Sequence, residues 1–129
     1  MNDISSELYS RRKYVRVLYS QEILCDTIFN PGSEEPIKIS KPLKFTCVDI
    51  GMGGIGILSN NEFEIDTIFS FNLCIDSIIY EISAKVIYCI PYGEIYRVGV
   101  EFLSLSSNLE DHIKRLVARL SFSGLLSNS

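Results

Sequence analysis

The sequence predicts a mainly β domain: a six-stranded antiparallel β-barrel followed by one C-terminal α-helix. Three observations lead to this fold class. Short runs rich in β-branched and aromatic residues recur through residues 15–103, loop signals separate them, and the hydrophobic period changes from strand-like to helical near residue 107. Many short antiparallel strands beside one terminal helix favour a closed barrel with the helix docked on it.

Six segments carry the strand pattern. Residues 69–76 show it most clearly, because apolar and polar side chains alternate with the two-residue period of a half-buried strand. Pro42 could break the second segment, and Pro91-Tyr92-Gly93 indicates that the last two segments form a hairpin. The predicted strands are 15–29, 37–50, 55–59, 69–76, 78–90 and 95–103.

A helical pattern follows the strands. Ser107 and Glu110 form a capping box at its start, and Gly124 is a suitable stop. We expect a flexible N-terminal segment over 1–10, a domain over 11–124 whose helix spans about 107–122, and a tail over 125–129. The apolar stripe of the helix consists of Leu109, Ile113, Leu116, Val117 and Leu120.

The bulk composition fits one globular domain. The chain has 129 residues, 47% hydrophobic and 22% charged, which argues against disorder. No apolar run approaches the ~20 residues that cross a bilayer, and residues 1–10 lack the regions of a signal peptide. We therefore expect a cytoplasmic protein without membrane insertion. The four cysteines stand far apart without a CxxC pair, so we expect neither disulfides nor a metal site.

The charge is unevenly distributed. The net charge is −4, but residues 1–16 contain four basic and two acidic groups, and the remainder contains eight basic and fourteen acidic groups. A basic cluster on an acidic body favours a small anion over a long polyanion, so we expect no DNA or RNA partner. A barrel that binds single-stranded nucleic acid is the weaker alternative, because the body lacks an extended basic stripe.

The glycine-rich segment 51–56 matches the dinucleotide-binding pattern G-x-G-x-x-G. That fingerprint requires a helix directly after the glycines, because the helix N-terminus holds the pyrophosphate. Residues 55–58 continue instead as a strand, and no P-loop lysine follows. We therefore expect the glycines to form a tight bend or bulge at a barrel corner, where a ligand could lie against exposed backbone.

Two patterns carry binding chemistry. Arg12 and Arg16 lie four residues apart beside Arg11 and Lys13, and guanidinium groups donate paired hydrogen bonds to phosphate and to the guanine edge. Asp49 ends the second strand, and a carboxylate can accept the paired N–H donors of guanine. Each pattern alone has a plainer interpretation, a solvated basic turn for the arginines and a turn-capping role for the aspartate.

In this order the two patterns resemble those of the PilZ family of cyclic di-GMP receptors. Arg12 and Arg16 match the RxxxR motif of the family, and residues 49–54 match its D/N-x-S-x-x-G motif. The late strand also looks like that of the family, with the sequence GVEF over 99–102, and a terminal amphipathic helix follows. The resemblance covers about residues 9–122 and implies a PilZ-like split barrel.

The resemblance implies a role for each matching residue. Arg12 and Arg16 would hold the phosphates and guanines of cyclic di-GMP, and Asp49 would contact a guanine. Gly54 would let the backbone lie close to the ligand. Arg11, directly before RxxxR, implies that the ligand binds as a stacked dimer.

Three further residues bear on this site. Lys13 adds positive charge, and Tyr88 is a weaker candidate for stacking on a base. Gly51 occupies the place of the family serine. A net hydrogen bond contributes about 0.5–1.5 kcal/mol, so the missing hydroxyl predicts binding weaker by up to roughly tenfold.

Catalytic patterns are absent from the sequence. His112 is the lone histidine, and no nucleophile–base set or metal-ligand spacing accompanies it, so we expect no enzyme and no cofactor. The leading hypothesis is a cyclic di-GMP receptor that changes conformation on binding and signals through an unidentified protein partner. The alternative is a degenerate PilZ-type adaptor that binds a protein without nucleotide, and Gly51 is its support.

Overall fold

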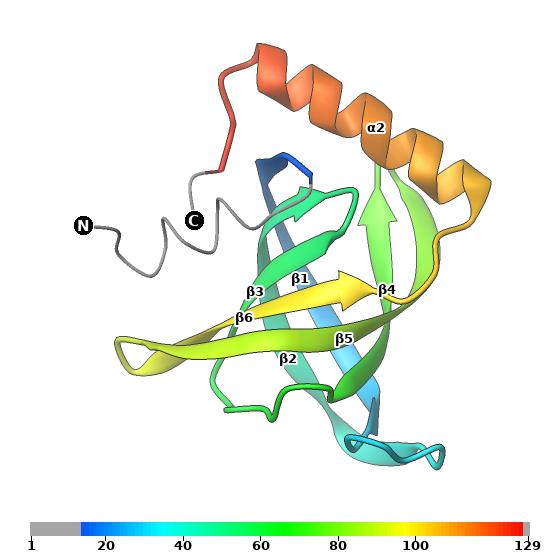
Figure 1. The fold of residues 1–129 in the computed structure, drawn as a ribbon, viewed down its shortest axis with the longest axis vertical. Helices are drawn as coiled ribbons and strands as arrows, with labels where there is room; N and C mark the ends of the chain where they lie inside the picture. Colours follow the sequence, from blue (N-terminus) through cyan, green and yellow to red (C-terminus); the bar gives the residue numbers. More distant parts are fainter. Residues whose placement is uncertain (1–13, 128–129) are drawn as a thin grey trace.

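The computed structural model describes residues 14–127, and Figure 1 shows strands wrapped into a barrel with one helix lying across one end. This architecture confirms the predicted fold class, a six-stranded closed antiparallel barrel with a C-terminal helix. The strands are β1 (Arg16–Phe29), β2 (Ile37–Gly51), β3 (Gly54–Ser59), β4 (Ile68–Ile75), β5 (Ile78–Tyr92) and β6 (Ile95–Phe102), and the helix is α2 (Ser107–Phe122).

The strand order around the barrel is β1-β2-β3-β6-β5-β4, and every neighbouring pair is antiparallel. Most neighbours are consecutive in the chain, as hairpin connections favour. Two pairings join strands that are distant in sequence, β3 with β6 and β1 with β4, and these close the barrel.

The β1–β4 seam is completed by side chains. Its backbone pairing begins only at Cys25, opposite Phe71. Nearer to α2, the Gln21 amide exchanges two hydrogen bonds with the backbone of Cys74, and the Tyr19 hydroxyl donates to the same carbonyl oxygen over 2.7 Å. Gln21 therefore substitutes for a missing pair of ladder bonds.

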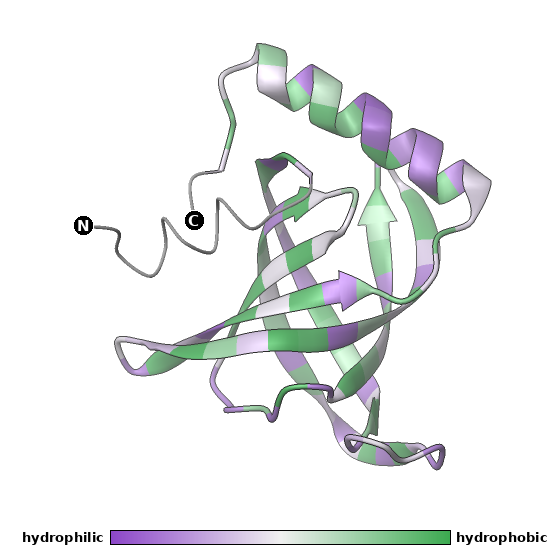
Figure 2. Ribbon diagram, viewed as in Figure 1, coloured by the Kyte–Doolittle hydropathy of each residue, from purple (hydrophilic) through white to green (hydrophobic). Residues whose placement is uncertain are grey.

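Strand alternation produces one core inside the barrel. Hydrophobic and hydrophilic positions alternate along the strands in Figure 2, and fully buried side chains come from every strand. Phe63 packs in T-shaped geometry on Phe45 and Phe69, with centroid distances of 5.8 Å and 4.8 Å. Pro42 does not break the second strand, because β2 continues through it. Pro42 lies where the β1–β2 register shifts, so its missing N–H removes no regular ladder bond.

Helix α2 docks on the barrel through the predicted stripe, with Leu109, Ile113 and Leu116 buried. Its cap differs from the prediction: Ser106, not Ser107, is the N-cap residue. Ser106 has the extended backbone that this position requires, and its hydroxyl accepts a hydrogen bond from the Leu109 N–H over 3.1 Å. Among residues 14–127, no helix is long and apolar enough to span a bilayer.

A polar network also holds α2. Asp76, in the β4–β5 turn, accepts a hydrogen bond from Nε2 of His112 over 2.8 Å and is paired with Arg119 over 3.0 Å. An ionised carboxylate only accepts, so Nε2 carries the hydrogen. Nδ1 of the same ring lies 2.6 Å from the Tyr80 hydroxyl. Buried His112 thus has a structural role in attaching the helix.

Candidate functional site

The site forms around Asp49, a buried carboxylate on the outer face of the barrel wall. Along β2, the side chains of Phe45, Cys47 and Ile50 are buried in the core. A register shift in the pairing with β3 places one extra residue between Cys47 and Asp49, and such a bulge re-aims the side chains that follow it. Asp49 therefore faces outward beside Gly56, yet it is 0% exposed.

Side chains of Arg16, Arg97 and Ser127 donate to the carboxylate of Asp49. Arg16, at the start of β1, donates from Nη1 to Oδ1 over 3.1 Å, and Arg97 of β6 donates from Nη2 to Oδ2 over 2.6 Å. Ser127 donates from Oγ to the same Oδ2 over 2.9 Å. Both arginines are buried. Two guanidinium groups around one carboxylate give this Asp49 cluster (Arg16, Asp49, Arg97 and Ser127) a net positive charge.

The ionisation of Asp49 follows from this arrangement. Desolvation by burial would raise the pKa of Asp49, but the charges of Arg16 and Arg97 and the hydrogen bonds from Arg97 and Ser127 together hold it below its ordinary value. At Cys47 burial prevails, and with the charge of Asp49 it raises the pKa of the thiol to about 12. The carboxylate is therefore ionised and the neighbouring thiol neutral at pH 7.

Two glycines make room for Arg97. A Cβ on Gly56 would lie 2.6 Å from Nη2 of Arg97 and 2.7 Å from Oδ1 of Asp49, so a side chain there would separate the ion pair. The ring of Tyr88 occupies the space that a Cβ on Gly99 would fill, and Tyr88 is hydrogen-bonded to Arg97. Desolvation would lower the pKa of Arg97, but Asp49 and Tyr88 raise it above its ordinary value.

The β2–β3 hairpin supports the start of β1. A Cβ on Gly51 would lie 2.6 Å from the carbonyl oxygen of Val15, and one on Gly53 would lie 3.3 Å from the ring of Tyr14. Gly54 allows the backbone of β6 to approach in the same way. The glycines thus form the predicted bend, and the chain's own backbone packs against it. A serine in place of Gly51 would require the start of β1 to move.

The segment after α2 crosses the site. Gly124 has a φ of 78°, a conformation that suits glycine at a helix stop, and Figure 1 shows the chain running from there back toward the start of β1. The Leu18 N–H donates to the carbonyl oxygen of Leu125 over 2.6 Å, and the Ser127 N–H donates to that of Arg16 over 2.9 Å. The tail therefore pairs with β1 as a short antiparallel bridge.

The structure brings part of the predicted site together. Arg16 and Asp49 are in direct contact, and Tyr88 joins them through Arg97. Gly51 and Gly54 lie in the adjoining hairpin. The predicted site residues that lie outside the described part of the chain are Arg11, Arg12 and Lys13.

Sequence reasoning missed three members of the site: Arg97, Ser127 and Gly56. Alternation correctly places Arg97 on the outer face of β6, but it does not indicate that the side chain is 7% exposed. A signal was present, because a lone arginine stands in an apolar strand and Gly99 follows on the same face. No local pattern marks Ser127, which reaches Asp49 only through the fold.

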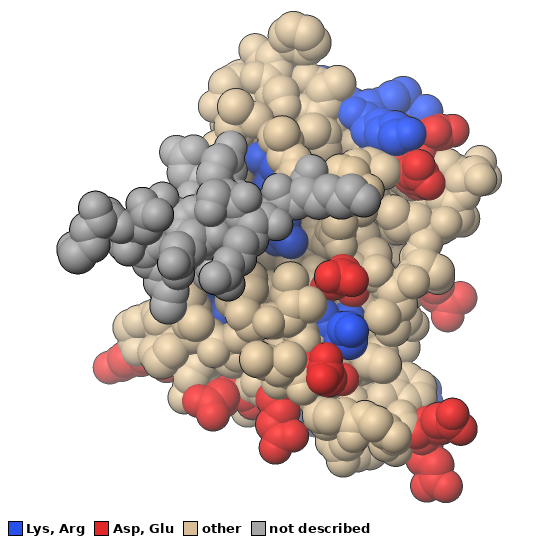
Figure 3. Space-filling view, viewed as in Figure 1, with Lys and Arg blue, Asp and Glu red and all other residues tan. Residues whose placement is uncertain are grey.

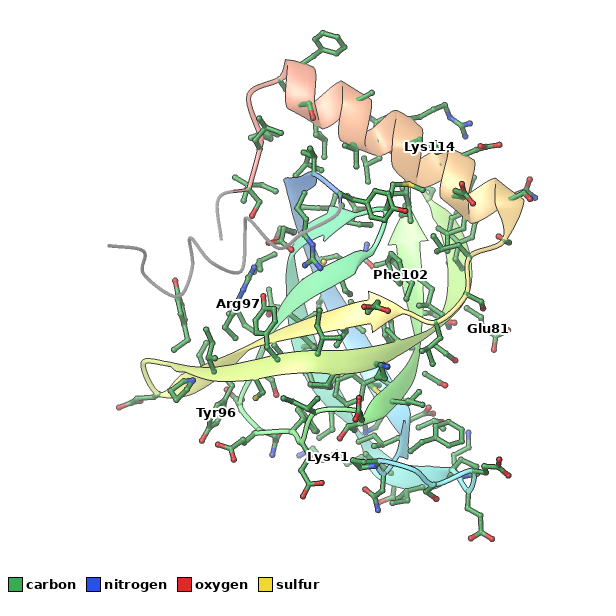
Figure 4. All side chains as sticks on the ribbon, in the orientation of Figure 1. Lys41, Glu81, Tyr96, Arg97, Phe102 and Lys114 are labelled. Atoms are coloured by element: carbon green, nitrogen blue, oxygen red, sulfur yellow. The ribbon has the colours of Figure 1, made fainter. Side chains whose placement is uncertain are left out.

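The figures show where Arg97 and the acidic side chains lie on the molecule. In Figure 4, Arg97 lies on the side of the barrel toward which the segment after α2 runs. Figure 3 shows acidic side chains spread over the lower part of the same view, with others beside α2. Among residues 14–127, no group of three or more His, Cys, Asp or Glu side chains could hold a metal ion.

The PilZ domain family matches residues 10–119 of this chain, whereas no curated protein matches it. Among solved structures, the chain is similar to the PilZ domain with c-di-GMP of YcgR from Escherichia coli. The two are 18% identical, with a TM-score of 0.58, and the match covers 88% of this chain and 94% of that one.

Two longer proteins share the fold. Escherichia coli YcgR in complex with c-di-GMP is 20% identical with a TM-score of 0.63, over 88% of this chain and 47% of that one. A pathogenic protein from Xanthomonas campestris, a tetrameric PilZ domain self-assembled via a helical bundle, is 20% identical with a TM-score of 0.51, over 66% and 48%. This chain spans about half the length of each. Because the family match extends over residues 10–119, the chain belongs to the PilZ domain family.

Proposed function

We propose that this chain is a receptor for cyclic di-GMP rather than an enzyme. The observation that carries the proposal is the contact between Arg16 and Asp49, which joins the two binding motifs at one place on the barrel wall. The net positive charge of the Asp49 cluster favours an anionic ligand. Family membership supports the same ligand, as do the two YcgR structures that contain c-di-GMP.

In this proposal the arginines of RxxxR, Arg12 and Arg16, hold phosphates and guanines, because their planar forks donate paired hydrogen bonds. Asp49 accepts from a guanine edge. Gly54 ends the second motif, and its missing side chain makes room for the backbone of β6 beside the site. Arg11 favours a stacked ligand dimer. Lys13 and Tyr88 have secondary roles, in charge and in stacking on a base.

Ligand binding also provides a route to signalling. Arg16 lies at the start of β1, so a ligand that contacts it changes the surface around the Asp49 cluster. We expect this change to alter the contact with a protein partner. The predicted closure of the N-terminal segment over the ligand concerns residues outside the described part of the chain, and it stays a prediction.

Titration calorimetry with cyclic di-GMP tests the proposal. We expect binding at tens of micromolar or tighter, an order-of-magnitude threshold, and a large loss of affinity in Arg12→Ala and in Arg16→Ala. Arg115→Ala, which removes an exposed arginine of α2, is the matched control and should bind like the wild type. Cyclic di-AMP serves as the control ligand, because adenine lacks the paired donors of the guanine edge. The absence of heat with cyclic di-GMP, or equal binding by all three variants, would refute the proposal.

Gly51 supports a second candidate function, a PilZ-type adaptor that has lost the nucleotide. In that case the folded protein shows no thermal shift with cyclic di-GMP, and it captures a partner equally well with and without nucleotide. The calorimetric titration separates the two candidates directly.

A further inference from the structure

We propose that the tail, Leu125–Ser127, is an internal competitor for Asp49 that cyclic di-GMP must displace in order to bind. The inference rests on the proposed function and adds a regulatory element to the same site. Its starting point is that Ser127, 1% exposed, donates its hydroxyl hydrogen to Oδ2 of Asp49 over 2.9 Å. The tail therefore occupies an acceptor position that the ligand needs.

The acceptors on Asp49 show why displacement is required. Oδ1 accepts from Arg16, and Oδ2 accepts from both Arg97 and Ser127. A guanine Watson–Crick edge presents two neighbouring N–H donors, and the two oxygens of one carboxylate suit such a pair. At least one present donor must leave before a guanine reaches Asp49.

Ser127 is the donor whose departure costs least. Removing Arg16 or Arg97 would leave a buried carboxylate with less compensating charge, which is strongly unfavourable. The Ser127 hydroxyl is neutral, so replacing it with a neutral guanine N–H keeps the charge of the cluster unchanged. At Oδ2 the exchange is therefore one hydrogen bond for another.

The tail lies outside the hydrophobic core. Its contacts with the barrel include backbone hydrogen bonds to β1 and the hydrogen bond from the Ser127 hydroxyl to β2. Leu125 and Leu126 remain 38% and 46% exposed, and neither belongs to the buried core. Segments outside the core open at a lower free-energy cost than core strands do. The apparent affinity of the ligand is then its intrinsic affinity reduced by the fraction of molecules whose tail is open.

Calorimetry on tail variants of the full chain measures this competition. Ser127→Ala removes the hydroxyl, Ser127→Pro also removes the backbone donor to Arg16, and a chain ending at Gly124 removes the tail. We expect cyclic di-GMP to bind about threefold more tightly to Ser127→Ala, and about tenfold or more to the other two. Ser123→Ala is the matched control, because its hydroxyl donates to Arg119 in α2 and not to Asp49.

Hydrogen exchange on the wild type gives an independent readout. The amides of Leu18 and Ser127 donate across the bridge, so both should exchange faster when cyclic di-GMP is added. Unchanged or weaker binding by all three tail variants, or slower exchange of both amides with ligand, would overturn the competitor role while leaving the receptor function intact. If no form of the protein binds cyclic di-GMP, the receptor function fails and the inference fails with it.

Discussion

At the residue scale, Asp49 of β2 and Arg97 of β6 can form an ion pair because β3, the strand between them, has a glycine beside the pair. Gly56 of β3 lies beside Asp49, and a single added carbon atom there would touch both charged groups. Burial of the ion pair thus depends on a residue that contributes no polar atom. The requirement is steric and local, since large side chains cannot be accommodated in a close-packed wall without strain.

Gly51 is also constrained by the space around it, and a substitution there tests this steric constraint. Gly51→Ser should lower the free energy of unfolding by about 1–3 kcal/mol, because its Cβ would meet the carbonyl oxygen of Val15 at 2.6 Å. It should therefore not tighten cyclic di-GMP binding, although it restores the family serine. Urea unfolding and calorimetry provide the two measurements.

Two variants separate sterics from the hydroxyl at this position. Gly51→Ala should destabilise the protein as much as Gly51→Ser does. Gly53→Ala should cost less, because within residues 14–127 its Cβ would meet only the ring of Tyr14, at 3.3 Å. Tighter ligand binding by Gly51→Ser at unchanged stability would show that the missing hydroxyl, not the packing, is decisive.

The predictable part of the site is the part encoded in local patterns. Arg16 and Asp49 belong to short motifs that the sequence shows directly, and their two side chains are in contact. The burial of Arg97 has a non-local cause: it depends on Tyr88 from another strand and on the carboxylate of Asp49. Ser127 reaches the site only because α2 ends where it does. Neither contact is visible in a sequence pattern, because each joins residues that are far apart along the chain.

At the element scale, the helix and the strands were predictable because each has a clear hydrophobic period. The cap of α2 was not, because Ser106 and Ser107 are chemically identical and only the backbone decides which of them receives the Leu109 N–H. Pro42 was likewise ambiguous, since its effect depends on the register of the strand beside it.

The attachment of α2 is testable through His112. His112→Ala should lower the free energy of unfolding by about 2 kcal/mol, because Tyr80 and Asp76 both lose a hydrogen-bond partner. Chemical denaturation measures the effect. Lys114→Ala, which removes an exposed i,i+4 ion pair with Glu110 on the same helix, should change stability by less than about 0.5 kcal/mol. Equal effects of the two substitutions would contradict a docking role for His112.

At the scale of the whole molecule, acid stability depends on carboxylates that are ionised in the fold. The pKa of Asp49 is held low against desolvation by its two arginines, and that of Asp76 is held low by hydrogen bonds from His112 and Arg119. A group with a depressed pKa in the folded state stabilises the protein above its unfolded pKa of about 3.9. That stability is lost as the pH falls through the folded pKa.

Asp76→Asn isolates one of these contributions. Asparagine tolerates the left-handed backbone at this turn, where φ is 50°. The variant should be less stable than the wild type at pH 7, and the two stability curves should converge as the pH falls below about 3.9 and through the lowered pKa of folded Asp76, where this carboxyl takes up its proton. Urea unfolding across this range measures both curves. Curves that stay parallel would show that the charge of Asp76 does not stabilise the fold.

The tail also covers the backbone of the first residues of β1. Backbone pairing between β1 and β4 begins only at Cys25, so Arg16 and Leu18 direct their outward carbonyl and amide groups to the tail. When the tail leaves, these groups become an open sheet edge, which can accept an extended strand from another chain. Displacement of three residues would thus both vacate the acceptor position that Ser127 occupies on Asp49 and create a template for β-augmentation, so one small movement would couple ligand capture to recruitment of a partner.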